Sequence, residues 1–285
     1  MNKKEIASLI RLLDDPDQEI FQHVEARLVT LGSQVIGQLE SEWEDSFDAL
    51  QQARIENLIH KIQFQSVKRD LEIWKLTGGT DLLKGLLIIN RYQYPDQDSQ
   101  QIIEKIYKMV ELAQSQYSLD NEAAENVRIL NQVLFTDFRL SGNTSNYHDP
   151  QNSYIGQVLE SGKGNPILLA AIYSIVAQRL GLPIYGVNLP KHFILAYTEA
   201  NELILDRDQI LFYINAFNRG QIFGRHDVVS FLRQLSLDLN PQFILPCDNF
   251  AIITRVLRNL SSAYSQMGNQ EKKEEIELLL STLTD

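Results

Sequence analysis

Apolar residues recur every three or four positions over two long stretches in the first half of the chain. This spacing puts apolar side chains on one face of a helix, so residues 4–62 and 66–135 are predicted to be helical. Polar residues and a proline at 14–16 interrupt the first stretch, as do Gly32 and Ser33, and Gly78 with Gly79 interrupts the second. The first half of the chain is therefore expected to be a succession of helices.

The segment NPILLAAIYSIVAQRLGLP, residues 165–183, has the signals of a complete helix. Asn165 can cap its N-terminus, Pro166 suits the first helical position, and Gly181 provides a left-handed stop. Residues 167–177 are apolar almost all round, so the helix must be covered on every side. We expect it to be the most buried helix of the protein.

Short strand-like stretches follow this helix. IYGVNL, HFILAYT and ELILD are predicted strands, and LFYINAF and GQIFG can add one or two more. Helical patterns then return at residues 227–235, 249–268 and 270–283. A buried central helix beside a small antiparallel sheet predicts a predominantly helical α+β fold.

The same pattern divides the chain into three parts. Residues 1–65 resemble one HEAT-type unit, with LLDDPD as the turn between helices, and residues 241–285 resemble a tetratricopeptide-like helical hairpin. Neither is long enough to be a repeat array, in which each unit buries its apolar face against its neighbours. We expect residues 66–240 to form the core between them.

Composition narrows the choice of partner. The formal net charge is −11 and the sequence pI is about 5.0, which disfavours binding to nucleic acid or to an anionic membrane. No run of about 18 apolar residues and no signal-peptide pattern occurs, so we expect a cytoplasmic protein. The single cysteine, Cys247, excludes an internal disulfide and a multi-cysteine zinc site. We expect no cofactor and a protein or peptide as partner, with the oligomeric state left open.

Residues 146–197, NYHDPQNSYIGQVLESGKGNPILLAAIYSIVAQRLGLPIYGVNLPKHFILAY, resemble the SirB-type transglutaminase-like family. The likeness extends over about residues 80–285 and implies a papain- or transglutaminase-like core with a helical tail. Enzymes of this fold place a Cys at the start of the central helix, a His on one strand and an Asp on the next. By resemblance, His192 and Asp206 match the His and the Asp. Pro166 or Ile167 falls where the Cys is expected, and neither side chain is a nucleophile.

Other polar residues near the central helix have alternative interpretations. The loop YHDPQNSY combines His148, Asp149 and Asn152, which could hold a metal or perform acid–base chemistry, but an Asp-Pro turn that caps a helix is the commoner use of this pattern. SGKGNP could hold a phosphate, although it lacks the rest of a phosphate-binding loop. We expect no metal site, and we place Asn165, Pro166 and Asn152 in the lining of the cleft.

Three functions remain open from the sequence. We favour a non-catalytic module for protein interaction or regulation, because the position of the nucleophile holds no reactive side chain. The alternative is a hydrolase or acyl transferase in which His192 acts as general base, oriented by Asp206, without a Cys nucleophile. The third is a cleft that only binds a small ligand. A cleft filled by side chains would exclude the enzyme.

Two further expectations concern single side chains. If a loop of three or five residues joins the two strands, His192 faces Asp206. The carboxylate then raises the pKa of the imidazole, unless burial of the ring lowers that pKa by more. Cys247 has no basic neighbour in sequence and precedes Asp248, so we expect its thiol to be inert.

Overall fold

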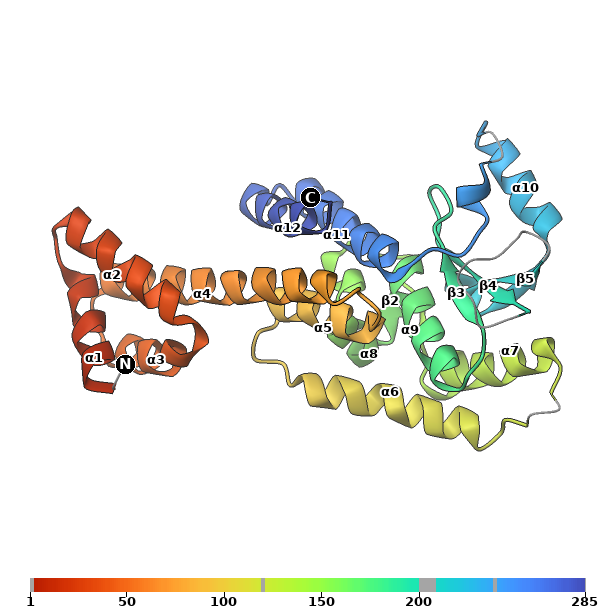
Figure 1. Cartoon of the computed structure of the whole chain (residues 1–285), viewed down its shortest axis with the longest axis horizontal. Coiled ribbons are helices and arrows are strands. Elements are labelled where there is room, and N and C mark those ends of the chain that lie inside the picture. The colour runs from red at the N-terminus through yellow and green to blue at the C-terminus, as the bar shows by residue number, and fades with distance from the viewer. Residues whose placement is uncertain (1–2, 119–120, 200–208, 238–239, 285) are drawn as a thin grey trace.

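The structure is a computed structural model that describes residues 3–118, 121–199, 209–237 and 240–284 (Figure 1). It is predominantly helical and contains a four-stranded antiparallel sheet and one short pair of parallel strands. The predicted α+β fold class is therefore confirmed. Within these described ranges, no helix has the length and apolar character needed to span a membrane.

Four helices build the N-terminal part of the chain: α1 (Lys3–Arg11), α2 (Gln18–Leu31), α3 (Ile36–Asp45) and α4 (Ala49–Leu76). The breaks expected between them are short 3-10 turns at Leu12–Asp14 and Gly32–Val35. Their buried side chains form a separate apolar cluster that ends at Ile62, whereas α4 continues into the rest of the molecule (Figure 1). The N-terminal helices are thus joined to the core by one long continuous helix.

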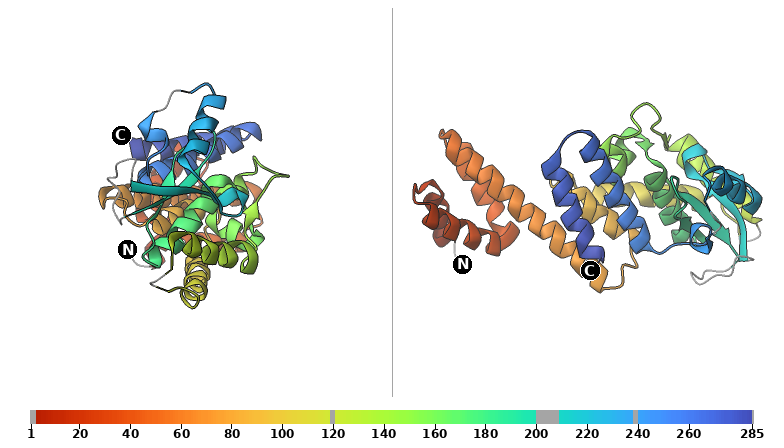
Figure 2. Two further views of the ribbon diagram at one scale, coloured as in Figure 1. Left: turned by 90° about the vertical axis from the view of Figure 1, so that its right-hand side faces the viewer. Right: turned by 90° about the horizontal axis from the view of Figure 1, so that it is seen from above.

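A second, larger apolar cluster begins at Phe64 in α4 and reaches Leu279 near the C-terminus. Its other helices are α5 (Leu82–Gln93), α6 (Ser99–Gln114), α7 (Ala123–Asn131), α8 (Ile155–Ser161), α9 (Pro166–Arg179), α11 (Asn249–Gln266) and α12 (Gln270–Thr284). The hairpin of α11 and α12 packs on α4, α5 and α9 and so belongs to this cluster (Figure 2). The division of the chain into three domains stays a prediction.

Helix α9 lies within the larger cluster, and every side chain from Pro166 to Ala177 is buried. Its start follows the predicted signals, because the Asn165 side chain accepts a hydrogen bond from the Leu168 amide at 3.0 Å. Gly181, with φ +76°, follows its end. Among the helices described, none has so large a buried share, as the apolar pattern predicted.

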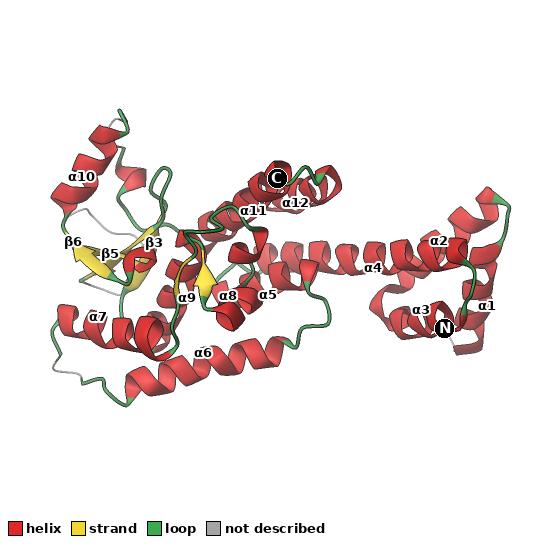
Figure 3. Cartoon of the chain, turned by 180° about the vertical axis from the view of Figure 1, so that it is seen from behind, coloured by secondary structure: helices red, strands yellow, loops and turns green. Residues whose placement is uncertain are grey.

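The antiparallel sheet packs between α9 and α10 (Arg225–Gln234). Its strands lie in the order β3 (Ile184–Val187), β4 (Ile194–Thr198), β5 (Ile210–Asn215) and β6 (Gln221–Phe223) (Figure 3). Strand β4 pairs with β3 along one edge and with β5 along the other. The strand predicted at residues 202–206 lies outside the described residues.

Two very short strands fix the loop that precedes α9. β1 (Ser141–Gly142) and β2 (Lys163–Gly164) pair in parallel, which brings residues 141–142 beside the segment that leads into α9. Between them lie α8 and the 3-10 turn Pro150–Ser153. The polar loop of the sequence is therefore held against the start of the central helix.

A partly buried ion pair links α12 to α4. His60 Nε2 lies 2.7 Å from Glu275 Oε1, and the hydroxyl of Tyr92 donates to Glu275 Oε2 at 2.7 Å. The hydrogen bond that His60 donates to Glu275 raises the pKa of His60, against the effect of burial. Burial of Glu275 acts to raise its pKa, but the hydrogen bonds from His60 and Tyr92 outweigh it, so the pKa is lowered.

We expect His60→Gln to reduce the free energy of unfolding more at about pH 5.5 than at about pH 8.5. The folded-state pKa of His60 is raised, so its contribution is complete below the unfolded value of 6.5 and is lost as the pH rises through the folded value. The side chain is 44% exposed, which limits the difference to about 1 kcal/mol. Urea denaturation at both pH values measures it, with His23→Gln as a surface control. Equal losses at the two pH values would contradict the ion pair.

Candidate functional site

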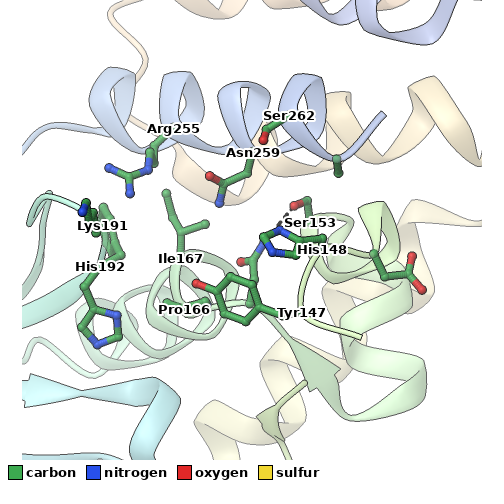
Figure 4. Close-up of a pocket in the computed structure, with 14 residues that line it drawn as sticks. Tyr147, His148, Ser153, Pro166, Ile167, Lys191, His192, Arg255, Asn259 and Ser262 are labelled. Carbon is green, nitrogen blue, oxygen red and sulfur yellow. Dashed lines mark hydrogen bonds between the residues drawn. The ribbon is translucent and has the colours of Figure 1, made fainter. Parts of the chain in front are cut away.

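A pocket of about 150 Å³ opens at the N-terminal end of α9. Residues 165–167 at the start of α9 form one side of it, and residues 255–263 of α11 face them (Figure 4). Residues 147–149, Ser153 and residues 191–193 complete the lining, which is largely polar. The cleft expected above Asn165, Pro166 and His192 is therefore open, and the C-terminal hairpin contributes to it.

Asn152 holds the loop beside the pocket in place. Its Nδ2 donates to the carbonyl oxygens of Asn146 and Tyr147 at 2.6 and 3.2 Å, and its Oδ1 accepts from Asn143 at 2.9 Å. The side chain is buried, and it is not among the residues that line the pocket. Asn152 was expected to line the pocket. Instead its hydrogen bonds position Tyr147, which does line the pocket.

The other polar residues of this loop also have structural partners. Asp149 accepts a hydrogen bond from the Gln151 amide at 2.9 Å and so caps the turn, which is the commoner use of this sequence pattern. His148 and Asp149 both line the pocket. In the part of the chain that the structure describes, no group of three His, Cys, Asp or Glu side chains is arranged to hold a metal ion.

The start of α9 presents no nucleophile to the pocket. Ile167 points from α9 toward α11, beside Pro166 (Figure 4). These are the two positions at which the resemblance leads us to expect a Cys. Cys247 is not among the residues that line the pocket, and its amide donates to the Gly186 carbonyl at 2.8 Å. Burial raises the pKa of the Cys247 thiol to about 12, so the thiol is protonated at neutral pH, as expected of an inert cysteine.

Two serines line the pocket without an activating base. The Ser153 hydroxyl accepts from Asn165 Nδ2 at 2.8 Å, and the Ser262 hydroxyl accepts from Gln266 at 3.4 Å. Among the described residues, no hydrogen bond joins either hydroxyl to an imidazole. A serine nucleophile needs such a neighbour to take its proton, and in this geometry neither hydroxyl is paired with one.

His192 lines the pocket, but its ring points away from the side chains of α11 (Figure 4). Asn215, at the end of β5, favours the charged form of the ring, and the ring centroid of His192 lies 6.3 Å from that of Phe231 in α10. Burial lowers the pKa of His192, the Asn215 hydrogen bond opposes this, and the charge of Arg255 lowers it further. The imidazole is therefore neutral at pH 7.

The expected partner of His192, Asp206, lies outside the described residues. That the two side chains face each other therefore stays a prediction. Asn215 reaches His192 because β5 pairs directly with β4, with Leu195 opposite Ile214. The alternating stretch LFYINAF marked β5 as a strand, but alternation does not say which strand is its neighbour. Sequence reasoning therefore missed Asn215.

We expect the His192 imidazole to titrate below pH 6.5, with opposite shifts in two variants. Asn215→Ala should lower the pKa, because the hydrogen bond that favours the charged ring is lost, and Arg255→Ala should raise it, because a nearby positive charge is removed. NMR titration of the imidazole carbons measures both shifts. Titration of His192 above 6.5 in the wild type would contradict the buried environment described here.

Comparison with known proteins agrees with this arrangement. Residues 100–258 match the model of the transglutaminase-like superfamily. A UPF0162 protein of Xylella fastidiosa is 30% identical over 213 residues, which cover 71% of this chain and 73% of that protein. A UPF0162 protein of Vibrio cholerae is 27% identical over 188 residues, 64% of this chain and 66% of that protein.

A more distant kind of protein shares part of the region. Human F-box only protein 21 is 36% identical over 93 residues, which cover 32% of this chain but 15% of that protein. No solved structure matches the chain significantly. The family match spans more than half of the chain and includes the pocket-lining residues that precede α11, together with Arg255, whereas the other α11 residues of the lining lie beyond residue 258. The chain belongs to the transglutaminase-like superfamily.

Proposed function

We propose that the chain is a non-catalytic, SirB-type member of this superfamily that binds a protein or peptide in the pocket above α9. In this role it serves as an interaction or regulatory module. The observation that carries the proposal is an open polar pocket lined by Pro166 and Ile167, at the start of α9 where the resemblance leads us to expect a catalytic Cys. A pocket that keeps its shape and polarity without a nucleophile is suited to binding rather than to covalent catalysis.

The helices at the two ends of the chain support this proposal. The N-terminal helices resemble a HEAT-type unit, and the C-terminal hairpin resembles a tetratricopeptide-like pair, both of which are used for protein binding. Helix α11 of this hairpin supplies Arg255, Asn259 and Ser262 to the pocket. A partner bound in the pocket would therefore also contact the hairpin.

One observation favours the enzyme as a second candidate function. His192 is a neutral imidazole held by Asn215, as a general base must be at pH 7. In such a mechanism His192 would take a proton from water or from a substrate hydroxyl, without a covalent intermediate. The direction of its ring, away from the side chains of α11, makes this the weaker candidate.

A binding experiment with a blocked pocket tests the proposed function. Peptide arrays are probed with the wild type and with Asn259→Trp, in which an indole fills the pocket from α11. Ser265→Trp is the matched control, because Ser265 is exposed on the same helix and does not line the pocket. We expect Asn259→Trp to lose peptides that the wild type and Ser265→Trp retain. Equal binding by all three proteins would contradict a role for the pocket.

A turnover experiment separates the two candidate functions. The wild type and His192→Ala are incubated with peptide amides, esters and primary amines, and the products are analysed by mass spectrometry. We expect no hydrolysis or acyl transfer above the background of buffer alone. Turnover by the wild type that disappears in the folded His192→Ala variant would replace the binding module with the general-base enzyme.

A further inference from the structure

Arg255 carries a positive charge into the pocket without a carboxylate partner. It is partly buried, and burial lowers its pKa. Its Nη1 donates to Asn188 Oδ1 at 2.9 Å, and no carboxylate among the described residues lies within ion-pair distance of it. Removing a guanidinium from water costs free energy, so partly buried arginines normally have an anionic partner. The anionic partner of Arg255 is therefore expected to come from outside the described residues.

The remaining charges of the lining also favour an anion. Lys191 lies on the same side of the pocket as Arg255 (Figure 4). Among the described residues that line the pocket, Asp149 is the one Asp or Glu, so Arg255 and Lys191 outnumber the carboxylates there by two to one. The whole chain, in contrast, has a net charge of −11. A local excess of positive charge in an acidic protein concentrates an anionic ligand at that place.

The shape of the site indicates the class of anion. Arg255, Asn259 and Ser262 are spaced by four and three residues, so they lie on one face of α11, and that face lines the pocket. The guanidinium is a planar fork that fits a carboxylate with two parallel hydrogen bonds. A phosphate would fit the same fork, but its second negative charge would lie in the same small pocket as Asp149.

From these observations we propose that the pocket binds a carboxylate group presented by a peptide, with Arg255 as its principal partner and Lys191 as a second positive charge. This inference rests on the proposed function and specifies its ligand. Two sources can supply the same chemistry: the C-terminal carboxylate of a peptide, or the side chain of an internal glutamate or aspartate. A cavity of about 150 Å³ accommodates a carboxylate with a short apolar segment.

The test uses three pools of degenerate hexapeptides with a fluorescent label. The first pool has free C-terminal carboxylates and no acidic side chains, the second has amidated C-termini and an internal Glu, and the third has amidated C-termini and Gln in place of Glu. Binding to the full chain is measured by fluorescence polarisation, with acetate and inorganic phosphate as competitors. The first two pools distinguish the two sources of carboxylate, and the third lacks the group.

Two arginines of α11 provide matched variants. Arg255→Ala removes the proposed partner, and Arg258→Ala removes an exposed arginine that does not line the pocket. We expect at least one acid-bearing pool to bind, and Arg255→Ala to weaken that binding about tenfold or more, the usual effect of losing a charge-assisted hydrogen bond. Arg258→Ala should change the affinity by less than about twofold, as expected for an exposed charge. Thermal unfolding checks that both variants are folded.

Three results would overturn the carboxylate inference. Equal binding of the third pool, with loss in Asn259→Trp, would show a pocket ligand without a carboxylate and would leave the proposed function intact. Stronger competition by phosphate than by acetate would assign the site to a phosphate group. Undiminished binding in Arg255→Ala would remove Arg255 as the partner. If no pool binds in a way that Asn259→Trp abolishes, the proposed function itself fails.

Discussion

An Ile172→Asp variant is expected to be unfolded at room temperature. Ile172 lies near the middle of α9, is fully buried, and belongs to the larger apolar cluster. The buried part of α9, from Pro166 to Ala177, contains no basic side chain that could neutralise a carboxylate. An unpaired buried charge costs several kcal/mol, roughly comparable with the total stability of about 5–15 kcal/mol for a domain. Far-UV circular dichroism and urea denaturation measure the loss.

Ile172→Val is the matched control for this variant. It removes one methylene group and should cost about 1 kcal/mol, so the protein should stay folded. A folded Ile172→Asp variant with a cooperative urea transition close to that of the wild type would contradict the central position of α9. Partial loss of helix, with the N-terminal helices still folded, would agree with their separate apolar cluster.

A cysteine placed at Ile167 is expected to react with alkylating reagents far faster than Cys247. Ile167 is itself only 1% exposed, but it lines the pocket, and the shorter Cys side chain leaves room for a reagent there, whereas Ile172 does not line the pocket. The new thiol would lie at the N-terminal end of α9 and in the same pocket as Arg255, both of which favour a thiolate. Even at an ordinary pKa of about 8.5, about 3% of such a thiol is ionised at pH 7. Cys247, whose pKa is raised to about 12, is ionised to about 0.001%.

The expected ratio of labelling rates is therefore on the order of a thousand or more, if the rate follows the fraction of thiolate. Ile167→Cys is made in a Cys247→Ser background and labelled with iodoacetamide, with Ile172→Cys as a buried control in the same helix. Mass spectrometry over time gives the rates. Labelling of Ile167→Cys as slow as that of Ile172→Cys would show that the start of α9 is closed to reagents.

Local signals in the sequence predicted the central helix well. The cap at Asn165, Pro166 at the first position and the stop at Gly181 are all interactions between residues close in the chain, and α9 has the predicted bounds. The all-round apolar pattern also predicted its burial, because no other environment suits such a helix. The fold class followed from the same reasoning.

The composition of the pocket was harder to predict, because it depends on which distant segments pack together. Arg255 and Asn259 reach the pocket through the packing of α11 on α9, and the helical pattern of α11 says which face is apolar but not what covers that face. Asn215 reaches His192 through the register of β4 and β5. Asn152 was expected in the lining because of its place in the sequence, whereas its hydrogen bonds serve the loop.

The absence of covalent chemistry at the start of α9 is tested most directly by the intact mass of the wild-type chain during incubation with an acyl donor. A short glutamine-containing peptide and its thioester serve as donors, and mass spectra are recorded over time. We predict that the mass of the chain stays unchanged and that the glutamine peptide is not consumed. An acyl adduct mapped to a residue of the pocket, or consumption of the glutamine peptide that His192→Ala abolishes, would contradict the proposal that the protein is non-catalytic.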